Sequence, residues 1–168
     1  YERMSTTTIN AYVMPIIERY LGDLVSRLTS GGLDVSLNVM QSNGGIMPSS
    51  ATGQKSVATI LSGPAGGVLG SHWIAKLAGL ENIITIDMGG TSADISLIAS
   101  GKYHRPTESE IGGHAIKIPM IDINTIGAGG GSIAWIDTGG LLRVGPQSAG
   151  ASPGPACYGI GGVEPTVT

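Results

Sequence analysis

The chain has 168 residues, of which 41% are hydrophobic, so it is long enough to form one domain with a buried core. Its net charge is −3 and its nine Lys and Arg residues are scattered, which excludes a basic stripe for nucleic acid and a polybasic patch for membranes. No apolar run reaches the roughly 20 residues of a membrane span, and a single cysteine, Cys157, excludes an internal disulfide and fits a reducing compartment, with the cytoplasm as the default.

Glycine is the anomaly of the composition, at 28 residues, and it clusters in short loops between apolar runs. There is no G-X-Y period of the kind that collagen requires. The chain starts at Tyr1 without an initiator Met and stops after a run of turn residues, so we expect it to be a piece of a longer polypeptide.

In the N-terminal part, residues 5–28 carry apolar side chains at helical spacing, with Ser5 or a following Thr as the N-cap and Gly31-Gly32 as the end. Pro15 is expected to kink this helix or to start a second segment. Residues 33–41 alternate apolar and polar side chains, which predicts a strand with one buried face, and a turn is expected at 42–45.

A second helix is predicted at 63–79, with Pro64 in its first turn and Gly79 at its C-terminal cap. Glycine costs a helix about 1 kcal/mol per residue relative to alanine. We therefore expect three of its glycines to serve close approach to another backbone or to a ligand: Gly66, Gly67 and Gly70. Trp73, in the same apolar run, is expected in the core.

Residues 83–98, IITIDMGGTSADISLI, are the most informative stretch, because two runs of alternating apolar residues meet at a Gly-Gly pair. We predict a β-hairpin that turns at Gly89 and Gly90, which accept positive φ and let backbone N–H groups approach an anion. Thr91 and Ser92 add hydroxyl donors where a phosphate would lie. The alternative is an ordinary hairpin, although such a turn requires neither the Thr-Ser pair nor the flanking acids.

Two aspartates, Asp87 and Asp94, flank this turn. Carboxylates beside a polyanion make sense if a hard cation such as Mg²⁺ lies between them, or if one carboxylate orients an attacking water. Asp87 and Asp94 are therefore the candidate catalytic and metal-binding residues.

The rest of the chain is less regular. Residues 115–123 predict another strand, a short apolar run with Trp135 as a core residue follows the GAGGGS segment at 127–132, and residues 137–168 read mostly as turns.

Residues 63–98 resemble the connecting helix and second phosphate motif of the actin, hexokinase and heat-shock chaperone superfamily. A closer similarity spans nearly the whole chain, which resembles the catalytic region of the hydantoinase A and 5-oxoprolinase family in six strings: VMQSNGG, LSGPAGGVLG, DMGGTSADISLI, GAGGGSIAWID, LRVGP and SAGASPGPACYG. The resemblance implies an α/β fold, an actin-like (ribonuclease H-like) ATPase lobe with a mixed sheet and flanking helices. Residues 1–168 would be a partial domain, a fragment of the hydantoinase A/oxoprolinase-type ATPase domain.

Members of that family couple ATP hydrolysis to the opening of a cyclic amide. The resemblance therefore implies ATP-dependent hydrolysis of a hydantoin, an N-methylhydantoin or 5-oxoproline, with a second, hydantoinase B-like subunit or domain as partner. One alternative is a subunit of a ketone carboxylase similar to acetone carboxylase, which bicarbonate and a ketone would reveal. A nucleotide-responsive regulatory or binding module is another, and its ATPase would respond only to a protein partner.

Carried over by residue, the resemblance implies a hairpin that binds the phosphates of ATP, with the two acids near Mg²⁺: Asp87, Gly89, Gly90, Thr91, Ser92 and Asp94. Residues 63–70 would lie beneath it, and a partner phosphate loop would precede residue 1.

The GAGGGS segment is expected to cradle the nucleotide or the activated substrate, because Gly129, Gly130 and Gly131 expose several N–H groups around one point. A structural tight turn is the alternative. Many relatives have Asp-Ile-His before this loop, whereas this chain has Asn124 as the third residue, so an imidazole for metal binding is absent there.

The remaining polar residues carry weaker signals. The histidines lack metal-ligand spacing and are expected at the surface or packed: His72, His104 and His114. Cys157 is expected to be a small buried thiol rather than a nucleophile, since no base is near in sequence. Glu108 and Glu110 are general-base candidates or parts of a charged loop.

Overall fold

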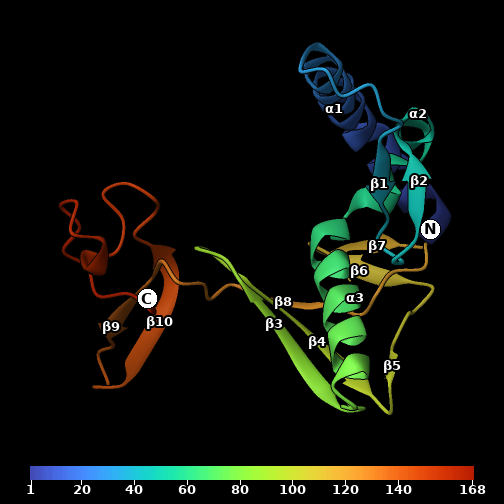
Figure 1. The fold of residues 1–168 in the computed structure, drawn as a ribbon. Coiled ribbons are helices and arrows are strands. Elements are labelled where there is room, and N and C mark those ends of the chain that lie inside the picture. The colour runs from blue at the N-terminus through green and yellow to red at the C-terminus, as the bar shows by residue number, and fades with distance from the viewer. The chain divides into compact units, whose positions relative to one another are not determined.

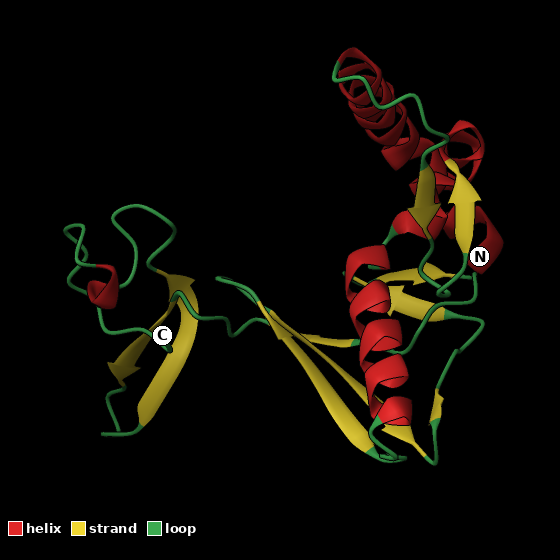
Figure 2. Cartoon of the chain, in the orientation of Figure 1, coloured by secondary structure: helices red, strands yellow, loops and turns green.

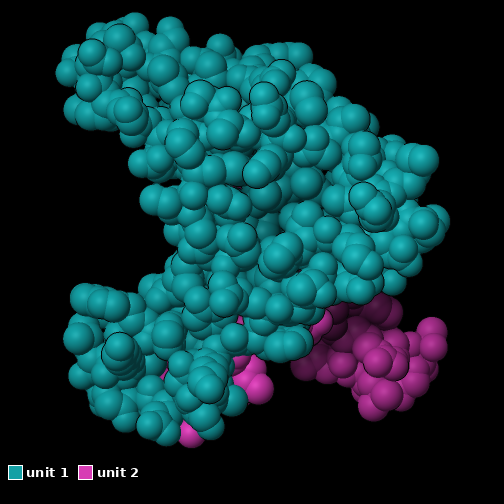
Figure 3. Space-filling view, turned by 90° about the vertical axis from the view of Figure 1, so that its right-hand side faces the viewer, with its two compact units in different colours: residues 1–81, 98–122 teal, residues 82–97, 123–168 magenta.

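The computed structural model describes residues 1–168, which form helices and short strands (Figures 1 and 2). The chain divides into two compact units, coloured separately in Figure 3. Unit 1 comprises residues 1–81 and 98–122, and unit 2 comprises residues 82–97 and 123–168. None of the helices combines the length and the apolar character needed to cross a membrane.

Unit 1 opens with the long helix α1, Glu2–Ser30. It starts before the predicted N-cap Ser5, whose amide already donates to the Tyr1 carbonyl at 2.9 Å, so that part of the prediction is wrong. Pro15 lies inside one continuous helix and does not begin a second one. The predicted end is confirmed, because Gly31 is the C-cap and Gly32 has φ +86°, a conformation that glycine adopts without strain.

The first two strands form a small antiparallel hairpin, with β1 at Asn38–Met40 and β2 at Ile46–Pro48. The predicted turn between them is confirmed, and Gln41 N donates to the Gly45 carbonyl at 2.8 Å. The predicted strand over 33–41 is too long, because β2 offers only a three-residue partner. Leu33 and Val35, expected on a buried face, are 55% and 61% exposed.

The next helices are α2 (Ser49–Thr52), the 3₁₀ helix η1 (Gly53–Thr59) and α3 (Ser62–Leu77). Helix α3 confirms the prediction for 63–79. The amides of Gly79 and Leu80 donate to the carbonyls of Lys76 and Ala75, at 3.3 and 2.8 Å. This bonding pattern is a Schellman cap, for which the left-handed φ of +72° at Gly79 is required.

The glycines inside α3 do not serve close packing within this chain. A Cβ at Gly67 or Gly70 would meet no atom within 4 Å, and at Gly66 its nearest neighbour would be Met40 Cε at 3.8 Å. The predicted approach of another backbone is therefore not found within residues 1–168. Trp73 is also not in the core, since it is 62% exposed.

The core of unit 1 includes a cluster of Val57, Ile116 and Met120, to which α1 contributes Ile9. Unit 1 also holds the short strands β5 (Lys102–Tyr103), β6 (Ser109–Ile111) and β7 (His114–Ile116), and β6 and β7 form an antiparallel hairpin.

The predicted strand at 115–123 is wrong beyond Ile116, because Pro119 has no N–H group to donate to a ladder. The next three amides donate instead to carbonyls on three separate residues: Met120 N to Pro106 O at 3.2 Å, Ile121 N to Ser42 O at 2.7 Å and Asp122 N to His104 O at 3.0 Å.

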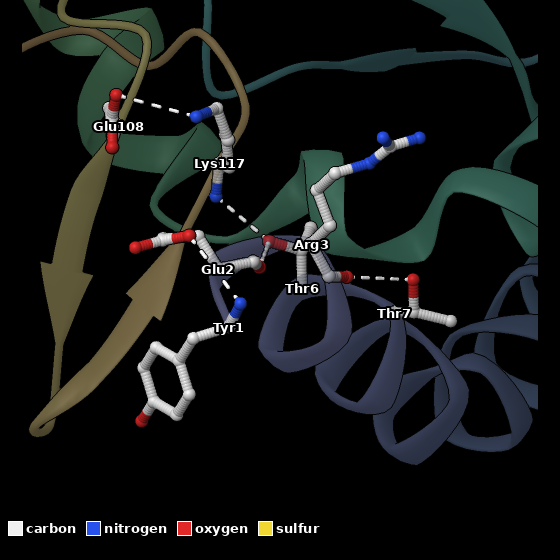
Figure 4. A network of polar contacts seen from close by, with 7 residues as sticks. All are labelled: Tyr1, Glu2, Arg3, Thr6, Thr7, Glu108 and Lys117. Atoms are coloured by element: carbon white, nitrogen blue, oxygen red, sulfur yellow. Dashed lines mark hydrogen bonds and ion pairs between the residues drawn. The ribbon is translucent and has the colours of Figure 1, made fainter.

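A polar network joins the start of α1 to the chain after β7 (Figure 4). Lys117 N donates to Thr6 Oγ1 at 2.8 Å, and the Thr6 hydroxyl donates to the Glu2 carbonyl at 2.6 Å. Lys117 Nζ also lies 3.6 Å from Glu108 Oε1, in a solvent-exposed pair of a kind that contributes about 0–1 kcal/mol. Glu108 is thus part of a surface ion pair.

Unit 2 holds β3 (Ile83–Met88), most of β4 (Ala93–Ala99), β8 (Asn124–Ile126), β9 (Ser132–Ile136), β10 (Leu142–Ser148) and the 3₁₀ turn η2 (Ala156–Tyr158). Strand β4 lies between β3 and β8, and its residues 93–95 pair antiparallel with β8. Its last two residues belong to unit 1, where they pair with β5.

Strands β9 and β10 form an antiparallel pair, although residues 137–168 were predicted to be mostly turns. Strand β10 escaped prediction because Gly145 and Pro146 interrupt its apolar alternation, and the register shifts between Val144 and Ser148.

Two residues of unit 2 are more exposed than predicted. Trp135 is 43% exposed, and its indole N–H donates to the Gly145 carbonyl at 2.8 Å. Cys157 is an exposed free thiol, because it lies in a single 3₁₀ turn flanked by glycine and proline and not in a packed core.

Asp137 organises the turn between β9 and β10. Its Oδ1 accepts hydrogen bonds from the amides of Gly139 and Leu141, each at 2.9 Å, and its Oδ2 accepts one from Arg143 Nε at 2.8 Å. The bond from the Leu141 amide, followed by the bond from Arg143, holds the pKa of the Asp137 carboxyl below its ordinary value.

We expect the Asp137 carboxyl to titrate below its ordinary pKa of about 3.9. Because its folded pKa is depressed, the carboxylate stabilises the turn above that ordinary value, and this stabilisation is lost as pH falls through the lowered pKa. Carboxyl ¹³C shifts, assigned with Asp137→Asn, measure the titration. A midpoint at or above the ordinary value contradicts the role of these hydrogen bonds.

Candidate nucleotide phosphate site

The predicted hairpin at 83–98 is present, as β3 and β4. Its turn has four residues, 89–92, and is closed by a hydrogen bond from Gly89 N to the Ser92 carbonyl at 2.9 Å. Neither Gly89 nor Gly90 has the positive φ that was predicted for the turn. A Cβ at Gly90 would meet no atom within 4 Å, so the fold of this chain does not itself require glycine there.

Three of the four backbone N–H groups of the turn make no hydrogen bond within the chain. The amides of Gly90, Thr91 and Ser92 donate no hydrogen bond within the chain, and Gly90 and Thr91 are exposed. Successive free amides in a turn make a concavity that suits an anion.

The two carboxylates lie on the two strands that enter and leave this turn. Asp87, on β3, is exposed, and its carboxylate makes no side-chain hydrogen bond or ion pair within the chain. Asp94, on β4, is half-buried, and its Oδ1 accepts a 2.5 Å hydrogen bond from the hydroxyl of Thr125, its register partner on β8. The Thr125 hydroxyl therefore restrains the Asp94 carboxylate, whereas no side-chain bond restrains the carboxylate of Asp87.

The glycine-rich segment 127–132 lies against the hairpin turn. Gly130 N donates to the Gly89 carbonyl at 2.9 Å, and Gly131 N donates to the Gly90 carbonyl at 2.7 Å. Gly129 N donates to Ser132 Oγ at 3.0 Å. The structure thus brings the two predicted glycine segments together, with the three loop amides engaged inside the chain.

The other candidates form no cluster. His114 is on β7 in unit 1, where it lines an open apolar groove of about 660 Å³ along α1. His72 Nε2 lies 3.0 Å from the Gly101 carbonyl and packs edge-on against Tyr103. Asn124 is exposed on β8. No group of three or more His, Cys, Asp or Glu side chains is placed to hold a metal ion.

Sequence reasoning missed Thr125 and Ser132, which hold Asp94 and the glycine loop. Thr125 carries no motif, and only the pairing of β4 with β8 brings it to Asp94. Ser132 closed the GAGGGS string, and its burial was not visible in the pattern.

The chain is a mixed α/β chain in which a turn with three unbonded amides lies between two aspartates and contacts a second glycine-rich loop. The chain belongs to the hydantoinase/oxoprolinase family, whose profile matches residues 3–168. The family expected from the six sequence strings is confirmed.

Two named relatives are similar along almost the whole chain. Caprolactamase subunit alpha from Pseudomonas jessenii is 46% identical over 168 residues, which are 100% of this chain and 24% of that relative. 5-Oxoprolinase 1 from Arabidopsis thaliana is 45% identical over 161 residues, 94% of this chain and 12% of that relative.

Solved structures share the fold. The nucleotide-free structure of acetone carboxylase superposes with a TM-score of 0.80 at 28% identity, over 98% of this chain and 23% of that one. The crystal structure of the ATP-dependent caprolactamase from Pseudomonas jessenii gives 0.77 at 44% identity, over 100% and 24%. The predicted α/β class is confirmed, and the chain spans about a quarter or less of the length of these proteins.

Proposed function

We propose that residues 1–168 are part of the ATPase domain of an ATP-dependent cyclic amidohydrolase. The substrate class is a hydantoin, an N-methylhydantoin or a lactam such as 5-oxoproline. The observation that carries the proposal is the hairpin turn, whose three consecutive unbonded amides lie between Asp87 and Asp94. The names of the relatives, caprolactamase and 5-oxoprolinase, support the same reaction class.

In this proposal the hairpin turn binds the phosphates of ATP. The amides of Gly90, Thr91 and Ser92, with the two hydroxyls, donate to phosphate oxygens in an arrangement that needs no reorganisation during the reaction. Mg²⁺ would be held by Asp87 and Asp94, directly or through its waters, and would neutralise charge on the moving phosphoryl group. The fit rests on an exposed, unbonded carboxylate opposite an oriented one.

The reaction divides into three steps. The amide oxygen of the ring attacks the γ-phosphorus, and ADP leaves with the electrons of the broken P–O bond. A first water adds to the activated ring carbon and loses a proton, and the C–N bond breaks as the nitrogen takes a proton, which leaves an acyl phosphate. A second water then hydrolyses the acyl phosphate to a carboxylate and free phosphate. Activation matters because an amide carbonyl is a poor electrophile until its oxygen becomes part of a leaving group.

The proposal also includes a partner subunit and a cellular location. A hydantoinase B-like subunit or domain supplies the hydrolytic half, in line with relatives that are named as subunits. A cytoplasmic location rests on Cys157, an exposed free thiol of a kind suited to a reducing compartment.

A ketone carboxylase is the second candidate, favoured by the structural similarity to acetone carboxylase. It would use the same phosphate grip and differ in the substrate that is activated.

The test is phosphate release by the full-length polypeptide, in the complex in which it is isolated, with Mg²⁺ and ATP. We expect hydantoin, N-methylhydantoin, 5-oxoproline or caprolactam to stimulate ATP hydrolysis, with one ring opened per ATP. Stimulation only by a ketone with bicarbonate would identify the carboxylase instead. A response to none of these small molecules, but to a protein partner, would contradict both enzyme proposals and favour a regulatory module.

A further inference from the structure

The glycine-rich loop 127–132 contacts the hairpin turn through backbone hydrogen bonds, and this contact determines the direction of two N–H groups of the turn. Two consecutive carbonyls of the turn, those of Gly89 and Gly90, accept hydrogen bonds from Gly130 N and Gly131 N at 2.9 and 2.7 Å. In a trans peptide the N–H group points opposite to the carbonyl of the same plane. The peptide bonds that follow Gly89 and Gly90 are not among the cis bonds of the chain.

The direction of two free amides follows from this geometry. The Gly89 carbonyl shares its peptide plane with the N–H of Gly90, and the Gly90 carbonyl shares its plane with the N–H of Thr91. Because the loop holds both carbonyls on its own side, both N–H groups are turned to the opposite side. The loop therefore decides where an anion would meet the turn.

The approach of the two segments is too close for any side chain. A Cβ on Gly129 would lie 2.6 Å from the amide nitrogens of Thr91 and Ser92 and 2.7 Å from the Gly89 carbonyl oxygen. A Cβ on Gly131 would lie 2.9 Å from the Gly90 carbonyl oxygen. Those neighbours are backbone atoms, so relief requires the turn or the loop to move.

The loop is also held from its other side, so it cannot simply retreat. Thr168 N donates to the Gly130 carbonyl at 3.0 Å, Ala149 N to the Gly131 carbonyl at 2.8 Å, and Val167 N to the Ser132 carbonyl at 3.1 Å. Ser132 is buried, and its hydroxyl and amide close the loop on Gly129. The less restrained partner in the contact is the exposed turn.

We propose that residues 129–132 of the loop are a positioning brace for the phosphate-binding turn, and that Gly129 and Gly131 are glycines because the brace must touch the backbone of the turn. In this role the loop amides do not bind the nucleotide themselves. They orient the N–H groups of Gly90 and Thr91 towards it. This inference rests on the proposed function, because it assigns the ligand of the turn as a phosphate of ATP.

The test compares Gly129→Ala with Gly127→Ala in the full-length polypeptide. Gly127 lies in the same loop, outside the left-handed φ region, and a Cβ there would meet no atom within 4 Å. Calorimetric titration with Mg²⁺ and ATP gives both the Kd and the fraction of molecules that bind. A substitution that only unfolds part of the protein lowers the fraction of molecules that bind ATP. A substitution that only changes the direction of the N–H groups of the turn leaves that fraction unchanged and raises the Kd.

We expect Gly129→Ala to raise the Kd about 10-fold to 100-fold, the loss of one to two hydrogen bonds to a charged group, with the binding fraction retained. Gly127→Ala should bind like the parent. If Gly129→Ala does not fold, Ser132→Ala carries the test, since it removes the acceptor of Gly129 N, and we expect a smaller rise of about 3-fold to 10-fold.

The outcomes separate the two proposals. A parent that binds no ATP contradicts the proposed function itself. A parent that binds ATP while Gly129→Ala and Ser132→Ala bind equally well overturns the brace and leaves the function standing.

Discussion

Replacing Asp87 with asparagine in the full-length polypeptide is expected to reduce ATP hydrolysis about a hundredfold or more. Losses of this size follow the removal of one preorganised electrostatic contact to a phosphoryl or acyl transition state. The Asp87 side chain is exposed and makes no hydrogen bond in the chain, so the substitution removes a charge without breaking a side-chain contact that holds the fold. The loss would therefore report on chemistry and not on stability.

Phosphate release at saturating ATP, with the melting temperature measured beside it, checks this expectation. Asp34→Asn is the matched control, because Asp34 is an exposed aspartate in unit 1 outside the proposed site. We expect the control to keep full activity. Unchanged turnover in Asp87→Asn would remove this residue from the proposed metal site, and an equal loss in both variants would point to a general effect of charge.

The second large effect is expected on stability. Ile116 is 2% exposed and packs with Val57 and Met120 in the core of unit 1. Truncation to alanine removes buried carbons and leaves a cavity, at a cost of about 2–5 kcal/mol in the free energy of unfolding. The midpoint of urea denaturation measures the change, read as the first transition, because a multidomain protein does not unfold in a single step.

Ile116→Val is the graded control for this core. It removes one methyl group and should cost about 0.5–1.5 kcal/mol. If alanine costs no more than valine, then β7 does not share a packed core with η1, and the cluster is only loosely formed. A large loss in both variants would instead indicate that the shape of the side chain matters more than its volume.

Local patterns predicted the elements whose stabilising groups lie close together in the sequence. The ends of α1 and α3 follow from Gly31-Gly32 and Gly79, because a helix is terminated by bonds to residues three to five positions away. The hairpin of β3 and β4 follows in the same way from two alternating runs joined by a short turn. The six strings were specific enough to identify the family that the profile over residues 3–168 shows.

Elements that depend on a distant partner were predicted poorly. The alternation at 33–37 has no partner strand within residues 1–168, and β10 pairs with β9 although Gly145 and Pro146 obscure its pattern. The exposure of Trp73 and of Cys157 was missed for the same reason. Burial depends on which residues pack against a side chain, and an apolar run in the sequence does not identify those residues.

The sequence by itself determined that a glycine turn between two aspartates exists, and that a second glycine loop follows it about forty residues later. Only the tertiary structure decided that the two meet, that the amides of Gly130 and Gly131 donate to the carbonyls of Gly89 and Gly90, and that three of the four amides of the turn make no hydrogen bond. The physical reason is that every backbone amide has one proton to donate, and which acceptor it finds depends on the neighbours that folding brings to it.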